Sequence, residues 1–317
     1  MLTAKYVPGA CLRPFETRAI RYAFHDIDGT HSLIREWPPV MSAVLNDVIE
    51  RGLPADFDSP ENRDRLISLS GTRALPETDR FCVESAGLSA LTQMEWAIRR
   101  AVEEGRVRTD ADAGANRFKI RAIRAGRETF EDMPDPPGMA ETLREYTPRL
   151  FKLYEAVLNG YCRDRNLLLA RKSPEAFRVK GSMEFLRFLR GAGVKSYFVT
   201  GAVVEKGMGM FEEVEALGYE IGPGGAAEDI IGSTWDRKMP KNEIMNALLE
   251  SLGAKGGEVL VTGDGRSEIA AGVEMGAVTI SRLNADALSQ RKLHQSLGTH
   301  LIVSDFCDAA IARMLSV

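Results

Sequence analysis

Hydrophobic residues follow two different patterns along the chain. From about residue 178 onward, apolar runs such as VKSYFVTG, EVLVTGDG, VTIS and HLIVSD have the composition of buried strands, and amphipathic segments such as KNEIMNALLESLGAKGG have the spacing of helices. One more strand-like segment, IRYAFHD, lies near the N-terminus. Strands that alternate with helices are typical of a parallel sheet with helices on its faces. The pattern therefore predicts an α/β fold.

The middle of the chain has few strand signals and frequent helical spacing. One apolar stripe consists of Leu150, Leu153, Tyr154, Val157 and Leu158. Intervals of three and four residues place these side chains on one face of a helix. We therefore predict a helical domain at residues 33–177, inserted into a core that consists of residues 1–32 and 178–317.

Bulk composition narrows the class of protein. The 317 residues are enough for about two domains, and 44% hydrophobic with 27% charged residues is an ordinary globular mixture. The formal net charge of −4 gives no reason to expect a nucleic acid or an anionic membrane as partner. The chain lacks an apolar run of membrane-spanning length, a secretion signal and paired cysteines. We expect a cytoplasmic protein, and its oligomeric state stays open.

Two carboxylates stand at the end of the first strand-like segment. Asp26 and Asp28 directly follow the apolar run, and Gly29 and Thr30 come next. Carboxylates so close together repel unless a positive group lies beside them, and Mg²⁺ prefers oxygen ligands of this kind. An ordinary Asp-Gly turn is the alternative interpretation of the same residues.

Three later segments carry polar residues at the end of a predicted strand or at the start of a predicted helix. Thr200 follows a buried strand, where a hydroxyl and the N–H groups of a helix N-terminus can hold phosphate. Lys238 and Lys241 lie in a loop that opens a helix, and Asp264 and Glu268 lie where another strand meets a glycine turn. Each has an ordinary structural explanation on its own: a helix cap for the threonine, an exposed side chain for the lysine and a turn for the acidic residues.

In combination, these segments resemble the haloacid dehalogenase (HAD) superfamily of phosphohydrolases and phosphotransferases. The first motif of that family, DxDGT, corresponds to residues 26–30, and its acidic fourth motif corresponds to the sequence GDGRSE at 263–268. Thr200 matches the second motif. Lys241 matches the third because it directly precedes the helical run, with Lys238 as the alternative. The resemblance implies a three-layer Rossmann-like core, with the insert as a helical cap of the C1 type.

The resemblance also implies roles for the acidic residues. Asp26 is expected to attack phosphorus and form an aspartyl-phosphate, and Asp28 is expected to protonate the leaving oxygen and later activate water. Mg²⁺ is the expected cofactor, bound by Asp26, the main-chain carbonyl of Asp28 and Asp264, with Glu268 acting through water.

Further residues are expected to hold the substrate. Thr200, Lys241 and the N–H group of Gly201 would bind the transferring phosphoryl oxygens. In the insert, the segment LSGTRALPE resembles the loop with which such caps reach the site. Thr72 and Arg73 are therefore expected to contact the substrate, and an exposed surface arginine is the alternative for Arg73.

Asp28 narrows the expected reaction, because dehalogenase and phosphonatase members lack an aspartate at that position. The sequence therefore predicts a Mg²⁺-dependent phosphatase that acts on a small phosphorylated metabolite. A phosphomutase of the same mechanism and a non-catalytic binding protein are the alternatives. His25 stands where an apolar residue is usual in the family, and we expect it to be neutral and hydrogen-bonded in the sheet core.

Overall fold

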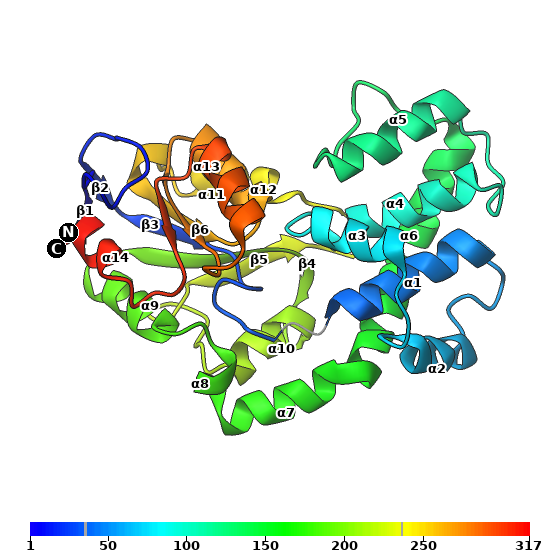
Figure 1. Ribbon diagram of the computed structural model, residues 1–317, viewed down its shortest axis with the longest axis horizontal. Coiled ribbons are helices and arrows are strands. Elements are labelled where there is room, and N and C mark those ends of the chain that lie inside the picture. Colours follow the sequence, from blue (N-terminus) through cyan, green and yellow to red (C-terminus); the bar gives the residue numbers. More distant parts are fainter. Residues whose placement is uncertain (35–36, 236) are drawn as a thin grey trace. The chain divides into compact units, whose positions relative to one another are not determined.

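The computed structural model describes residues 1–34, 37–235 and 237–317 (Figure 1). The chain forms two compact units, which we call the sheet unit and the helical unit. The sheet unit comprises Met1–Arg35, Leu167–Thr234 and Met239–Val317, and the helical unit comprises Glu36–Asn166 and Trp235–Lys238. Residues 167–177 belong to the sheet unit, although the sequence analysis placed them in the insert. Leu167 and Ala170 explain this difference, because they are buried in an apolar cluster with Phe198 of the sheet.

A parallel six-stranded sheet is the centre of the sheet unit, which confirms the predicted α/β class. Its strand order is β5-β4-β3-β6-β7-β8, and every neighbouring pair is parallel. The two inner strands β3 and β6 carry almost only buried side chains, as expected for a sheet covered on both faces. The strands are β3 (Tyr22–His25), β4 (Lys195–Glu205), β5 (Asp229–Ser233), β6 (Val259–Gly263), β7 (Val278–Arg282) and β8 (Leu301–Val303).

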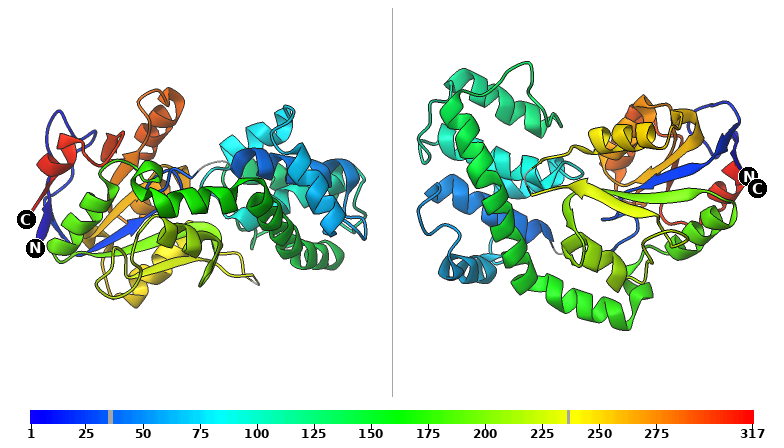
Figure 2. Two further views of the ribbon diagram at one scale, coloured as in Figure 1. Left: turned by 90° about the horizontal axis from the view of Figure 1, so that it is seen from below. Right: turned by 180° about the vertical axis from the view of Figure 1, so that it is seen from behind.

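Helices cover both faces of this sheet (Figures 1 and 2). Apolar residues of α11 and α12 pack on one face, where they meet side chains of β3, β4 and β6. Apolar residues of α9 and α10 pack on the other face. The helices of this unit are α8 (Pro174–Phe177), α9 (Ser182–Gly191), α10 (Gly209–Ala216), α11 (Lys241–Ser251), α12 (Arg266–Glu274), α13 (Leu288–Leu297) and α14 (Ala309–Met314), with a 3₁₀ turn at Gly256–Glu258.

A small antiparallel sheet joins the two ends of the chain, and the sequence analysis did not predict it. β1 (Leu2–Ala4) pairs with β2 (Arg18–Ile20) on one side and with β9 (Leu315–Ser316) on the other. The expected single strand IRYAFHD is therefore two strands, β2 in this sheet and β3 in the parallel sheet.

The helical unit consists of helices and connecting segments in its described residues, in agreement with the predicted helical insert. The predicted stripe from Leu150 to Leu158 lies on α6, and its five side chains are buried. Within the described chain, no helix is both long and apolar enough to span a membrane. The helices are α1 (Trp37–Arg51), α2 (Pro60–Leu69), α3 (Pro76–Glu84), α4 (Ala90–Glu103), α5 (Ala113–Arg124) and α6 (Pro137–Leu158), followed by a π-helical turn (Asn159–Arg163) and by α7 (Asp164–Lys172), which continues into the sheet unit.

Candidate active site

Acidic residues gather at the carboxyl edge of the parallel sheet. β3 ends at His25 and β6 ends at Gly263, so that Asp26 and Asp264 directly follow two neighbouring parallel strands. The N–H group of Asp26 donates to the carbonyl of Thr262 at 2.9 Å, which continues the strand pairing by one bond. Ligands bind at this edge in open α/β sheets. The strand register therefore brings the two predicted acidic segments together.

Three carboxylates in this cluster are arranged so that they could hold a metal ion. Asp26, Asp264 and Glu268 each offer one oxygen, and these oxygens lie within 4.8 Å of one another. Asp26 and Glu268 are buried, and Asp264 is partly buried. Hard divalent cations such as Mg²⁺ are bound by carboxylate oxygens of this kind. The donor set therefore fits the expected Mg²⁺.

Glycines allow Glu268 to fold back towards this cluster. A Cβ atom at Gly263 would lie 2.3 Å from both Cγ and Oε1 of Glu268. The N–H group of Gly265 donates to Glu268 Oε1 at 2.5 Å, which holds the carboxylate at the start of α12. The two glycines of the GDG sequence thus make room for the third carboxylate.

Lys241 is the cation that the structure brings to the cluster. It is the first residue of α11, and its Nζ donates to Asp26 Oδ1 at 2.6 Å and to Glu268 Oε2 at 3.0 Å. Its side chain is 2% exposed. A divalent cation could be held by oxygens of the same three carboxylates beside this ammonium.

Burial and nearby charges both change the pKa of Asp26, the nucleophile candidate. Burial raises the pKa of Asp26 well above its usual range, and the nearby Glu268 and Asp264 raise it further, while Lys241 lowers it. The pKa of Lys241 itself is raised, because the two carboxylates outweigh the opposing effect of burial. The ammonium therefore stays charged and favours the ionised form of Asp26.

Lys238, the alternative match to the third motif, lies in the helical unit. Its Nζ donates to Glu95 Oε2 at 2.8 Å and to the carbonyl of Glu128 at 2.6 Å. The structure thus places Lys241, and not Lys238, against Asp26.

The segment after β3 forms a tight loop, which we call the Asp26–Ser32 loop. The carbonyl of Ile27 accepts N–H groups from Thr30, His31 and Ser32. Gly29 has a positive φ of 75°, which a glycine adopts without strain, and its N–H group donates to the carbonyl of Ser32.

Two further contacts relate this loop to its surroundings. The hydroxyl of Thr30 lies 3.4 Å from Asp264 Oδ1. Asp28 is partly buried, and its main chain forms a bridge with Ser32. Both predicted aspartates of the first motif are therefore part of one ordered loop.

The surroundings of Thr200 differ from the prediction. β4 continues through Glu205, with an irregularity in its pairing to β5 between Val199 and Val203, and α10 begins only at Gly209. Thr200 and Gly201 are therefore not followed by a helix N-terminus. The buried hydroxyl of Thr200 accepts the N–H group of Ala202 at 3.1 Å. The continued pairing with β5 explains the error, and the phosphate-binding role of both residues stays a prediction.

The predicted substrate residues of the insert lie in a turn after α2. The hydroxyl of Thr72 donates to the carbonyl of Leu69 at 2.7 Å. Arg73 is 62% exposed and lies 4.0 Å from Glu50. Their contacts with a substrate stay predictions.

His25, the last residue of β3, and His31 of the loop form a buried pair. His25 Nδ1 lies 2.7 Å from the hydroxyl of Thr262, and its Nε2 lies 3.2 Å from that of Ser196. His31 Nε2 lies 3.2 Å from His25 Nδ1 and its Nδ1 lies 2.6 Å from the hydroxyl of Ser182. Burial lowers the pKa of His25 to about 3. His25 is thus hydrogen-bonded and neutral at pH 7, as expected.

Sequence analysis did not identify Arg282 at the carboxyl end of β7. Its Nη1 donates to the carbonyl of Gly29 at 3.1 Å, and its Nε donates to the carbonyl of Ser304 at 3.0 Å. The only available signal was a charged residue directly after the apolar run VTIS.

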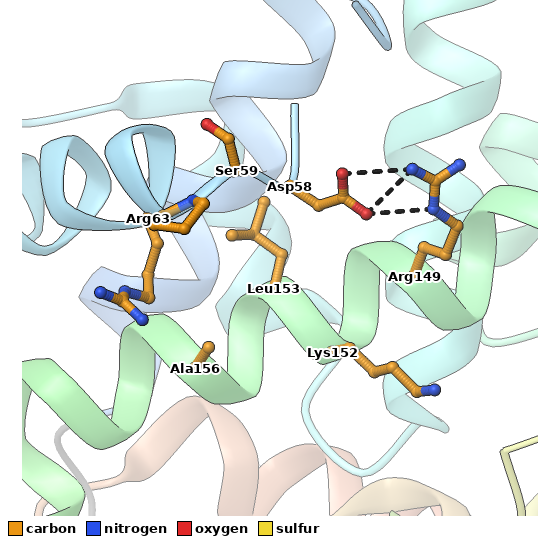
Figure 3. Close-up of a pocket in the computed structure, with 8 residues that line it drawn as sticks. Asp58, Ser59, Arg63, Arg149, Lys152, Leu153 and Ala156 are labelled. Atoms are coloured by element: carbon orange, nitrogen blue, oxygen red, sulfur yellow. Dashed lines mark hydrogen bonds and ion pairs between the residues drawn. The ribbon is translucent and has the colours of Figure 1, made fainter. Parts of the chain in front are cut away.

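A separate hollow of about 210 Å³ lies within the helical unit, between α2 and α6 (Figure 3). Arg149 points to Asp58 and donates to its two carboxylate oxygens at 3.0 and 3.1 Å. Because this carboxylate already pairs with the arginine, we assign no phosphate site to the hollow. Its lining consists of Asp58, Ser59, Pro60, Arg63, Arg149, Lys152, Leu153 and Ala156.

The chain is similar to solved structures at low sequence identity. No protein-family model matches the chain, and no curated protein matches it. Among solved structures, a candidate phosphoglycolate phosphatase from Lactobacillus delbrueckii is 15% identical, with 93% of this chain and 99% of that chain covered and a TM-score of 0.49.

Two further structures complete this comparison. A candidate β-phosphoglucomutase from Bacteroides vulgatus is 15% identical, with coverages of 93% and 88% and a TM-score of 0.48. A HAD-family hydrolase from Deinococcus radiodurans, which contains bound phosphate and sodium, is 17% identical, with coverages of 93% and 96% and a TM-score of 0.42.

Proposed function

We propose that this chain is a Mg²⁺-dependent phosphohydrolase of the HAD superfamily, acting on a small phosphorylated metabolite. One observation carries the proposal. The carboxylate of Asp26 lies at the carboxyl edge of the sheet, bonded to Lys241 and within reach of a cation that Asp264 and Glu268 would share. A nucleophile, a buried ammonium and a set of hard ligands are the parts that phosphoryl transfer requires.

Asp26 has the position of a nucleophile, and Lys241 opposes the effect of burial on its charge. The bond from Lys241 to Oδ1 fixes the carboxylate and favours its ionised form. The carboxylate would attack phosphorus to form an aspartyl-phosphate, while Asp28 gives a proton to the leaving oxygen. Asp28 would then take a proton from the water that hydrolyses the intermediate. Lys241 would also balance charge on the transferring phosphoryl oxygens.

Mg²⁺ would be held by Asp26, Asp264 and the main-chain carbonyl of Asp28, with Glu268 in support. When bound, it would screen the negative charge of the phosphate from the attacking carboxylate. Thr200 and Gly201 are proposed to contact the phosphoryl group, and Thr72 and Arg73 to contact the rest of the substrate. A phosphomutase would use the same groups with a sugar hydroxyl in place of water.

Phosphate release from p-nitrophenyl phosphate and from a panel of small phosphorylated metabolites tests the proposal. We expect release with Mg²⁺, none with EDTA, and a loss of at least about 1,000-fold in Asp26→Asn, which cannot form the acyl phosphate. Asp286→Asn, at an exposed aspartate of the same unit, is the matched control and should match the parent. Acceleration by a bisphosphate would identify the mutase instead. Equal activity of Asp26→Asn and the parent would remove the nucleophile assignment.

A binding protein without catalytic activity is the remaining alternative. It predicts no phosphate release from any compound of the panel and no covalent modification of Asp26. Beryllofluoride mimics a phosphoryl group on an aspartate, and mass spectrometry or ¹⁹F NMR would detect its complex. A parent that neither releases phosphate nor binds beryllofluoride at Asp26 would exclude the proposed function.

A further inference from the structure

Arg282 connects β7 to the Asp26–Ser32 loop, although another strand lies between them. In the sheet order, β6 separates β3 from β7. The side chain of Arg282 starts at the carboxyl end of β7, and its Nη1 reaches the carbonyl of Gly29, 3.1 Å away. Only 8% of the residue is exposed. The guanidinium is thus an internal bond donor at the edge that carries the candidate active site.

The guanidinium is fixed in direction by a second bond. Its Nε donates to the carbonyl of Ser304, in the segment after β8, at 3.0 Å. Because the guanidinium is planar and rigid, two bonds from different nitrogens determine where each N–H group points. Arg282 therefore ties the Asp26–Ser32 loop to the β8 side of the sheet unit.

The bond from Arg282 to Gly29 acts on the residue next to Asp28. The N–H group of Gly29 donates to Ser32 inside the loop, and its carbonyl accepts from Arg282. On the other side of Asp28, the carbonyl of Ile27 accepts three N–H groups of the loop. Both neighbours of Asp28 are thus held, and the bond to Gly29 from Arg282 comes from outside the loop.

We propose that Arg282 is a positioning residue for Asp28 in its role as general acid, an inference that rests on the proposed function. Asp26 is held by β6 and by Lys241, so the loss of Arg282 would displace the acid more than the nucleophile. General acid catalysis typically contributes about 100- to 10,000-fold, and a misplacement of about 1 Å can cost about 100-fold. The effect must therefore depend on how strongly the leaving group needs a proton.

Two aryl phosphates of similar shape measure this dependence. Phenolate is a strong base and needs protonation when it leaves, whereas p-nitrophenolate is a much weaker base. The quantity to measure is kcat/KM, because it reports the step in which the leaving group departs. For Arg282→Met, we expect a loss of about 100-fold with phenyl phosphate and of less than about 5-fold with p-nitrophenyl phosphate.

Arg291→Met is the matched control. Arg291 donates to the carbonyl of Leu283, the residue after Arg282, and not to the Asp26–Ser32 loop. It should leave both kcat/KM values within about twofold of the parent. Arg282→Lys keeps a cation that can donate to Gly29 but loses the rigid fork. It should give an intermediate loss with the same dependence on the leaving group, and it decides the question if Arg282→Met does not fold.

Each other outcome has a defined meaning. Equal losses with both substrates, or a ratio of the two kcat/KM values unchanged from the parent in both variants, would overturn the positioning role. A rise in KM of the same size for both substrates, with unchanged kcat, would overturn it in favour of a direct contact with the substrate. If the parent and Arg291→Met themselves lack metal-dependent phosphate release, the proposed function fails, which is a different result from failure of the Arg282 proposal.

Discussion

Replacement of Lys241 by methionine removes an ammonium group from the carboxylate cluster and keeps an apolar stem of similar length. Nζ lies 2.6 Å from an oxygen of Asp26 and 3.0 Å from one of Glu268. With an effective dielectric constant of about 20, Coulomb's law gives an attraction of roughly 6 kcal/mol for each contact. Desolvation cancels part of this, and removal of one partner from a buried pair typically costs about 3–5 kcal/mol. We expect Lys241→Met to lower the free energy of unfolding by that amount without Mg²⁺.

Thermal and urea unfolding in EDTA measure the loss. The sheet unit has about 180 residues, for which about 1 kcal/mol corresponds to roughly 2–4 °C in Tm, so its transition should fall by about 6–20 °C. Lys238→Met is the matched control in the helical unit. Lys238 Nζ lies 2.8 Å from Glu95, but its side chain is 23% exposed and Glu95 keeps its pair with Arg99, so we expect a smaller loss of about 1 kcal/mol.

The response to Mg²⁺ separates the electrostatic explanation from a packing defect. In Lys241→Met, the three carboxylates remain close together, and Asp26 and Glu268 lose their bonds to the ammonium. Mg²⁺ should therefore bind the folded variant more tightly than the parent and raise its Tm by a larger amount. A loss below about 1 kcal/mol in EDTA, or the same gain from Mg²⁺ in both proteins, would refute the reasoning.

Two further predictions concern the ligand set and the buried histidines. Gly263→Ala places a Cβ atom 2.3 Å from Glu268, so Mg²⁺ affinity in calorimetry should fall by about 10- to 100-fold, whereas Gly191→Ala, whose Cβ meets nothing within 4 Å, should match the parent. Burial lowers the pKa of His25 to about 3 and also lowers that of His31. Their contribution to the free energy of unfolding is therefore full above pH 6.5 and falls as the pH is lowered towards 3. The loss is up to about 1.4 kcal/mol per pH unit for each histidine. Urea unfolding between pH 7 and 5 measures this slope, and a slope unchanged in His31→Asn would contradict the assignment.

The local sequence pattern was sufficient to predict most strands of the parallel sheet. It was insufficient to predict β5 and the small antiparallel sheet. β4, β6 and β7 are runs of apolar residues between glycines and helical segments, so their sequence alone predicts buried strands. β5, with the sequence DIIGS, directly follows the glycine-rich segment GPGGAAE and is too short to be distinguished from a loop. β1 and β9 have three and two residues, and their pairing joins the two ends of the chain. Such pairing depends on tertiary structure, which local propensity does not encode.

The candidate site likewise has contacts that the sequence predicts and contacts that it does not. Asp26 and Asp264 could be predicted to meet, because residues that follow neighbouring parallel strands lie at one edge of the sheet. Lys241 could be predicted from its place at the start of a helix. The bond from Arg282 to Gly29 joins residues 253 positions apart through a side chain, and no spacing rule connects them. The prediction for the surroundings of Thr200 was wrong because β4 pairs with β5 again beyond that residue.

Residues outside the motif thus also shape the Asp26–Ser32 loop. His31 follows the DxDGT sequence and is wholly buried, with its ring stacked on Phe306 at a centroid distance of 4.9 Å. Arg282 holds the same loop through Gly29. An apolar side chain at position 31 would fill a similar volume but could not bond to Ser182 and His25, so those polar groups would lose a buried partner. The geometry of the Asp26–Ser32 loop therefore depends on buried polar contacts outside the DxDGT sequence as well as on the motif itself.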